Sequence, residues 1–133
     1  MEIHFVNPKG AHETTGYSHA GYFDGPGRVV YISGQVAKNE KGETVGIGSV
    51  EEQTRQVYKN LTSVLSSMGG SLENVIKMNF YTTRLDQISA IRKVRGEFFA
   101  GKELPCSTLV GVTGLASPDF LIEIEAVAIL NPQ

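Results

Sequence analysis

Two glutamates near the C-terminus, Glu123 and Glu125, have the residue type and the spacing that acid–base chemistry needs. Residues two apart on a strand point to the same face, so these carboxylates would lie roughly 6–7 Å apart. A carboxylate held at such a position can pass a proton between water and a substrate. Alternating glutamates also commonly pair with cations across a strand, so the pattern alone leaves a catalytic and a structural interpretation open.

The other reactive residue types are few. His4, His12 and His19 lie in the N-terminal segment without the spacing of metal ligands, so we expect no metal site. Tyr17 lies in an irregular segment, where its side chain could enter a cleft or cover the core. Cys106 follows a proline and has no histidine near it in sequence, which favours a structural thiol over a nucleophile.

Several well-known functional motifs do not occur in the sequence. There is no P-loop and no G-x-G-x-x-G, G-x-S-x-G or H-E-x-x-H, which removes the recognisable phosphate-binding, dinucleotide-binding, serine hydrolase and zinc protease signatures. Arg92, Lys93 and Arg95 form a small basic cluster. Because helix surfaces in contact with water commonly carry such charges, we interpret this cluster as a solvated helix face.

The segments around these residues predict a chain of mixed helices and strands. Ser49 and Glu52 fit a capping box, and apolar residues recur at helical spacing as far as Met68, which predicts a helix from about residue 50. A second helix is predicted from Asp86, as its N-cap, to about Phe99. Strands are predicted from β-branched, aromatic or alternating composition at residues 28–32, 75–82, 108–114 and 120–130.

The last predicted strand indicates that the chain does not act alone. Its even positions from Phe120 to Leu130 are all apolar and would lie beneath the two helices. Its odd positions combine Leu121, Val127 and Ile129 with the two glutamates, which is too apolar for a sheet face left in water. Because two helices cover only one face, we expect a homo-oligomer that buries the other.

Length and charge set the broad class of protein. The chain has 133 residues, 41% of them hydrophobic, which fits one globular domain over residues 1–133. Its 12 basic and 14 acidic residues give a net charge of −2, so we expect no nucleic-acid partner. One cysteine and the lack of a long apolar stretch fit a cytoplasmic protein without membrane contact.

Five short blocks follow one another in a specific order. They are residues 16–20 (GYSHA), 31–35 (YISGQ), 52–54 (EQT) leading to 60–61 (NL), 98–105 (FFAGKELP) and 122–126 (IEIEA). Each block is weak alone, but together they span nearly the whole chain. In this order they resemble the reactive intermediate deaminase family, also called RidA, YjgF-type or L-PSP endoribonuclease-like.

This resemblance implies a chorismate-mutase-like α+β fold of order βββαβαββ, with a mixed sheet, two helices on one face and assembly into a homotrimer. Deaminating members of the family hydrolyse enamine or imine intermediates such as 2-aminoacrylate, without a metal or other cofactor, in clefts between protomers. By their positions in the motifs, Tyr17, Ser33, Gly34 and Glu123 would line the small-molecule cleft. Glu123 would activate the attacking water, and Glu125 would be structural.

One position departs from the family pattern. Deaminating members carry a Pro-x-Arg motif whose guanidinium holds the substrate carboxylate, whereas here Pro105 is followed by Cys106 and Ser107. Loss of such a charged pair would weaken carboxylate binding by roughly 10- to 150-fold. The hydroxyls of Ser107 and Thr108 could instead bond a neutral carbonyl, and His19, where the family commonly has glutamine, could supply a titratable donor.

These features favour one function over two others. The first is an enamine or imine deaminase, a hydrolase acting on C=N bonds, whose activity is weakened or whose substrate is altered by Ser107. The alternative is a non-catalytic small-ligand-binding or accessory protein that keeps the cleft without the chemistry. An endoribonuclease activity, attached to some relatives, is least favoured because the chain is acidic and lacks a histidine pair in a basic groove.

Overall fold

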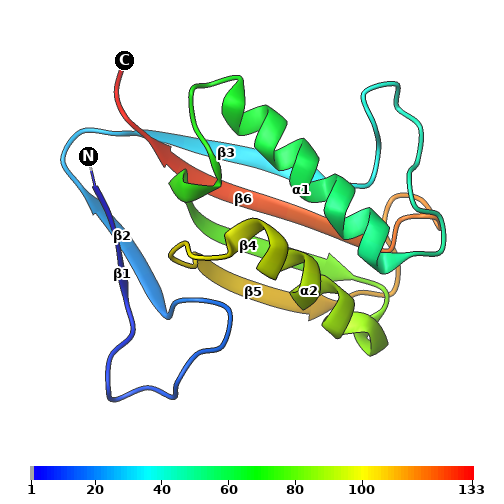
Figure 1. The fold of residues 1–133 in the computed structure, drawn as a ribbon, viewed down its shortest axis with the longest axis horizontal. Helices are drawn as coiled ribbons and strands as arrows, with labels where there is room; N and C mark the ends of the chain where they lie inside the picture. The colour runs from blue at the N-terminus through cyan, green and yellow to red at the C-terminus, as the bar shows by residue number, and fades with distance from the viewer. Residues whose placement is uncertain (1) are drawn as a thin grey trace.

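The computed structural model describes residues 2–133, and its elements follow the expected order βββαβαββ (Figure 1). The strands are β1 (Glu2–Val6), β2 (Ala20–Asp24), β3 (Arg28–Gln35), β4 (Val75–Thr82), β5 (Cys106–Gly111) and β6 (Ile122–Leu130). The helices are α1 (Val50–Ser66) and α2 (Ile88–Phe99). Two short 3-10 helices accompany them: η1 (Leu72–Asn74) lies between α1 and β4, and η2 (Leu85–Gln87) lies directly before α2. Both long helices lie on one face of the larger sheet, so the α+β class is confirmed.

The strands form two sheets. β1 and β2 pair antiparallel as a hairpin, and the other four strands have the order β3-β6-β4-β5. β4 and β5 run parallel, with α2 in the connection between them, whereas β6 is antiparallel to both of its neighbours. The larger sheet is therefore mixed. An isolated bridge between Ser18 and Cys106 links the segment before β2 to the β5 edge of this sheet.

The two helices differ in how they begin. Ser49 Oγ accepts a hydrogen bond from the backbone N–H of Glu52 at 3.1 Å, which gives α1 its expected N-cap. α2 begins at Ile88 and has no side-chain cap. The prediction of Asp86 as its N-cap is wrong, because the Asp86 carboxylate instead accepts a hydrogen bond from Arg84 at 2.8 Å.

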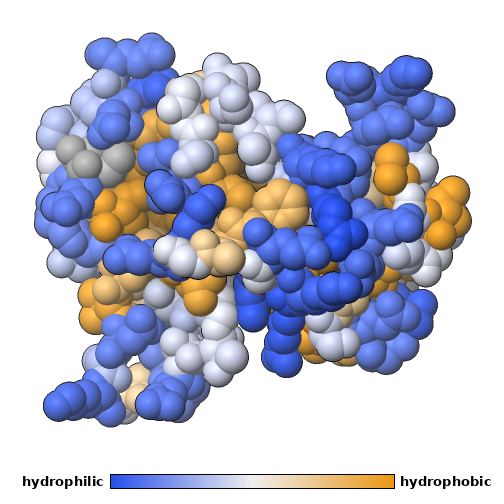
Figure 2. Space-filling model, viewed as in Figure 1, coloured by the Kyte–Doolittle hydropathy of each residue, from blue (hydrophilic) through white to orange (hydrophobic). Residues whose placement is uncertain are grey.

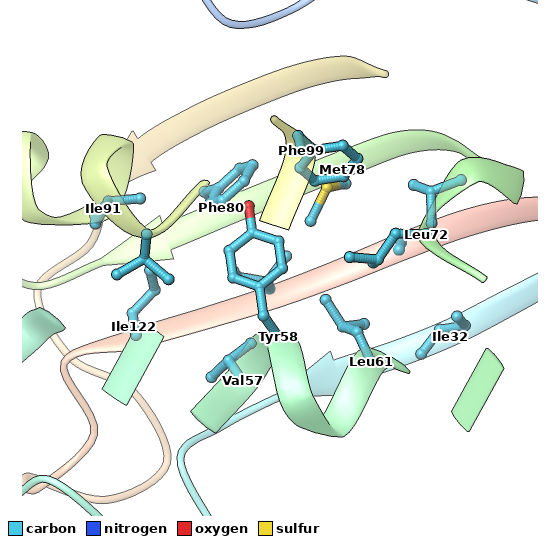
Figure 3. Packing of buried hydrophobic residues seen from close by; sticks show 14 of the residues in the cluster. Ile32, Val57, Tyr58, Leu61, Leu72, Met78, Phe80, Ile91, Phe99 and Ile122 are labelled. Carbon is cyan, nitrogen blue, oxygen red and sulfur yellow. The ribbon is translucent and has the colours of Figure 1, made fainter. Parts of the chain in front are cut away.

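The hydrophobic core lies between the two helices and the larger sheet (Figure 3). Tyr58 and Leu61 of α1 and Met78 and Ile122 of the sheet are each less than 2% exposed. Seen from the helix side, the outer surface is mostly hydrophilic with smaller apolar areas (Figure 2). Burial of these apolar side chains is the main source of stability for this layer.

The opposite face of the larger sheet, called here the open face, is covered by no helix of residues 2–133 (Figure 1). Ile129 is only 2% exposed within the single chain, so the expectation that its burial needs another copy is wrong. Leu121 likewise packs against the core. On β3, Tyr31 is 81% exposed and Val29 is 44% exposed. The exposed apolar surface that favours an oligomer therefore lies mainly on β3 and not on the neighbouring strand β6.

Candidate functional site

The carboxylate of Glu123 lies directly against the backbone of Gly34. Glu123 is on β6, and Gly34 is near the end of β3, where the pairing register shifts between Ile32 and Gln35. A Cβ added at Gly34 would overlap Glu123 Oε2 and would lie 2.7 Å from Glu123 Cδ. The missing side chain at residue 34 thus makes the space that the carboxylate occupies.

Glu125, two residues further along β6, is held by neighbouring side chains. Tyr81 Oη donates to Glu125 Oε1 at 2.6 Å, and Asn79 Nδ2 donates to the same oxygen at 3.2 Å. The bond to the carboxylate raises the pKa of Tyr81 above its ordinary value. Within residues 2–133, no ion pair or side-chain hydrogen bond engages Glu123. This difference supports a structural role for Glu125 and leaves the Glu123 carboxylate available.

Two other expected site residues also lie on the open face. Ser33 lines a hollow of about 300 Å³ together with Tyr31, Asn79 and Glu125. Thr108, paired in register with Asn79, accepts a hydrogen bond from Lys77 Nζ at 2.7 Å. The Thr108 hydroxyl therefore already has a partner on its own sheet.

Tyr17 and Ser107 lie apart from this group. They line a cavity of about 380 Å³ between α2 and β5. Ser107 pairs in register with Met78, whose side chain is buried beneath the helices, so Ser107 points to the helix side of the sheet. Glu123 points to the open face, as its register partner Tyr81 does. A single chain thus keeps Ser107 and Glu123 on opposite sides of the sheet.

His19 belongs to a cluster of rings in the segment between β1 and β2. Its Nε2 donates to the backbone oxygen of His12 at 2.7 Å, and His12 Nε2 lies 2.9 Å from Tyr17 Oη. The His12 and His19 rings meet edge to face at 4.7 Å. His19 lines neither the cavity with Ser107 nor the hollow with Ser33, so its connection to the candidate site runs through His12 and Tyr17.

Cys106 is partly buried on β5. Burial raises the pKa of the Cys106 thiol, which disfavours the thiolate and fits a structural role. Across residues 2–133, no three histidine, cysteine, aspartate or glutamate side chains come together as a group that could hold a metal ion. The described helices are all too short or too polar to cross a membrane.

Arg95 is the residue that the sequence pattern misplaced. It is half-buried and lines the same cavity as Tyr17 and Ser107, so its interpretation as part of a solvated helix face is wrong. Lys93 fits that interpretation, because it is exposed and forms a surface ion pair with Glu51 at 3.0 Å. The signal that was missed is spacing: Arg95 follows the buried Ile91 by one helical turn and shares its side of α2.

The structure defines a small α+β protein with a carboxylate on the open face of its larger sheet. Residues 9–130 match the family described as Endoribonuclease L-PSP. The chain belongs to this family, and the resemblance carried by the five sequence blocks is thereby confirmed.

Individual relatives agree with this assignment. The chain is 37% identical over 100 residues to the 3-aminoacrylate deaminase RutC of Acinetobacter baylyi. The matched region makes up 75% of this chain and 78% of that protein. It is 35% identical over 102 residues to a RutC family protein of Pyrococcus horikoshii, covering 77% and 79% respectively. The structure of the Rid family protein YyfB from Yersinia pestis, of unknown function, superimposes with a TM-score of 0.90 at 36% identity, over 98% of this chain and 100% of that one.

Proposed function

We propose that this chain is a cytoplasmic, cofactor-independent enamine or imine deaminase that hydrolyses a small reactive metabolite in clefts between the protomers of a homotrimer. The observation that carries the proposal is the Glu123 carboxylate, which lies against Gly34 without a hydrogen-bond or ion-pair partner among residues 2–133, while Glu125 accepts two hydrogen bonds. Membership of a family with a 37% identical relative named as a 3-aminoacrylate deaminase supports the reaction class.

In the proposed reaction, Glu123 accepts a proton from a water molecule as the water oxygen bonds to the imine carbon. The π electrons of the C=N bond move to the nitrogen, and Glu123 passes the water proton to it, which gives a carbinolamine. Glu123 then accepts the proton of the carbinolamine hydroxyl as the C=O bond forms. It delivers this proton to the nitrogen as the C–N bond breaks and ammonia leaves, so the carboxylate is regenerated and the net reaction consumes one water.

The proposed assembly follows from the separation of the candidate residues. Tyr17 and Ser107 lie on the helix side of the sheet, and Glu123 and Gly34 belong to its open side, so one chain alone does not form a joint cleft. A second copy placed against the exposed Tyr31 would bring its own Tyr17 and Ser107 toward the open face. The high exposure of that apolar ring supports this arrangement.

The test compares Glu123→Gln with Glu125→Gln, because both changes remove one carboxylate from β6. Ammonia release from enzymatically generated 2-aminoacrylate and from 3-aminoacrylate is measured above the spontaneous rate. We expect Glu123→Gln to lower turnover by about 100-fold or more, since it removes the group that accepts the proton. Glu125→Gln should retain most of the turnover. Unchanged turnover in Glu123→Gln, with the oligomer intact, contradicts the proposal.

The alternative is a non-catalytic small-ligand-binding or accessory protein, and Ser107 is the observation that favours it. This function predicts ligand binding without any acceleration of enamine hydrolysis by the wild-type chain. Gain of 2-aminoacrylate hydrolysis in Ser107→Arg would then indicate a site that lost its chemistry. Robust wild-type hydrolysis excludes the alternative. The net charge of −2 disfavours the ribonuclease activity that the family description names.

A further inference from the structure

The cavity between α2 and β5, called here the α2–β5 cavity, combines an apolar wall with polar groups. Phe80, Ile91 and Leu109 supply apolar surface, and the side chains of Tyr17 and Ser107 border it. At about 380 Å³ it can hold a small organic molecule. Among residues 2–133, no aspartate or glutamate lines it, although two arginines do. The cavity therefore has a positive electrostatic character.

Acidic residues on and beside α2 do not neutralise these arginines. These acidic residues instead form ion pairs with other cations: Asp86 with Arg84 at 2.8 Å, Glu97 with Arg55 at 2.8 Å and Glu51 with Lys93 at 3.0 Å. None of the ion pairs within residues 2–133 includes Arg92 or Arg95. Both guanidinium groups consequently lack a carboxylate partner among the described residues, although Glu97 lies on the same helix.

Arg95 is the better placed of the two arginines. Arg92 is exposed, whereas Arg95 is half-buried, and this loss of water lowers the pKa of Arg95 below its ordinary value. A Cβ added at Gly16, whose φ is 86°, would overlap the Arg95 guanidinium. The guanidinium thus packs on bare backbone, where a side chain at residue 16 would displace it. A partly dehydrated cation without a partner is a strong binding site for an anion.

We propose that the α2–β5 cavity binds a small monocarboxylate with a short apolar chain, and that Arg95 holds its carboxylate. Two parallel N–H···O bonds from one guanidinium match the two oxygens of a carboxylate, and the carbon chain would lie against Phe80 and Leu109. Arg92, at the exposed side, would attract the anion from solution. This inference rests on the proposed function in one respect, because Tyr17 and Ser107 are assigned to the same cleft.

The test measures binding of butanoate to the full-length chain by NMR titration, with butanamide as the neutral probe of equal size. We expect butanoate to shift amide resonances of α2 and β5 and to bind at least about 10-fold more tightly than butanamide, since a charged pair contributes about 1.5–3 kcal/mol. Equal affinity for the two probes overturns the proposal. Equally tight binding of inorganic phosphate also overturns it, because phosphate has no apolar chain.

Variants then assign the binding to Arg95. Arg95→Gln should weaken butanoate binding by about 10-fold or more, and Arg95→Lys should weaken it less, because the charge remains while the two parallel bonds are lost. Lys59→Gln, at an exposed position on α1, makes the same charge change outside the cavity and should alter affinity by less than about 2-fold. Unchanged butanoate affinity in a folded Arg95→Gln protein contradicts the assignment.

A rescue experiment separates a binding role from a structural one. Ser107 lines the same cavity as Arg95, so Arg95→Gln combined with Ser107→Arg supplies a guanidinium from β5 instead of α2. We expect the double variant to regain most of the butanoate affinity lost in Arg95→Gln. Butanoate binding without hydrolysis of any enamine would count against the deaminase proposal alone, whereas hydrolysis that Arg95→Gln leaves unchanged would count against this inference alone.

Discussion

The helix-covered side and the open face of the larger sheet each hold a tyrosine, and the two hydroxyls differ in whether they have a hydrogen-bond partner. On the covered side, the Tyr58 hydroxyl is buried and has no hydrogen-bond partner within residues 2–133. On the open side, the Tyr81 hydroxyl donates to Glu125 at 2.6 Å. Packing against apolar side chains thus holds Tyr58 and a specific hydrogen bond holds Tyr81, although the covered side also contains Gln53, which is fully buried and hydrogen-bonded to the backbone of Asp119 and Leu121. We infer that stability resides mainly in the covered side, so that residues of the open face can change with little cost to folding.

The largest expected effect is on the covered face. Leu61→Ala should lower the free energy of unfolding by about 2–5 kcal/mol, because it removes a fully buried side chain and leaves a cavity. Urea denaturation measures the change. Val29→Ala, at a side chain that is 44% exposed on the open face, is the matched control and should cost less than about 1 kcal/mol. Similar losses in both variants would contradict the division between the faces.

Sequence patterns predicted the covered layer well, because burial leaves a periodic signal. The strand predicted at residues 75–82 has these bounds as β4, and α1 begins at Val50 as expected. Less regular segments were less predictable. The strand expected at 108–114 is β5, Cys106–Gly111, and the one expected at 120–130 begins only at Ile122. Composition also did not reveal that β1 and β2 form a separate sheet, since strand pairing depends on tertiary contacts.

The candidate site was predictable in part. Motif positions indicated Glu123 and Gly34, and the structure places them in direct contact. The side of the sheet that Ser107 faces could not be inferred, because it depends on the parallel register of β5 against β4. Arg95 was assigned to the solvated helix face because a charged residue between apolar ones on a helix usually extends its charge into water.

The next effect concerns association through the open face. Tyr31→Asp should weaken self-association by about 10-fold or more, because it places a charge where a ring that is 81% exposed would be buried between copies. Sedimentation velocity over a range of concentrations measures this. Tyr22→Asp, at a ring that is 48% exposed on the hairpin, is the control and should have the smaller effect. A wild-type chain that remains monomeric throughout would contradict the trimer and the shared cleft.

The smallest effect at neutral pH is expected for Tyr58→Phe. The lost hydroxyl has no partner, so the free energy of unfolding should change by less than about 1 kcal/mol. Burial raises the pKa of Tyr58 above the ordinary value of 10.0, so the folded state favours the neutral phenol. The stability that comes from keeping this phenol neutral is fully present below the unfolded-state pKa of the tyrosine, and it is lost as the pH rises above that pKa.

The same substitution should therefore reduce the loss of stability in alkali. Urea midpoints of wild type and Tyr58→Phe, measured on both sides of the ordinary tyrosine pKa of 10.0, test this expectation. Tyr81→Phe provides the comparison from the open face, since the pKa of Tyr81 is raised mainly by its bond to Glu125. An alkaline loss in Tyr58→Phe as large as in wild type would contradict the effect of burial on this phenol.

The outer side of β3 has one more consequence. β3 pairs only with β6, so alternate backbone N–H groups of the strand that carries Ser33 and Gly34 have no strand partner within residues 2–133. Backbone amides of this kind exchange their hydrogen for deuterium quickly unless something covers them. Slower exchange along β3 as the protein concentration rises would indicate that a neighbouring copy covers this strand, next to Glu123, when the chains associate.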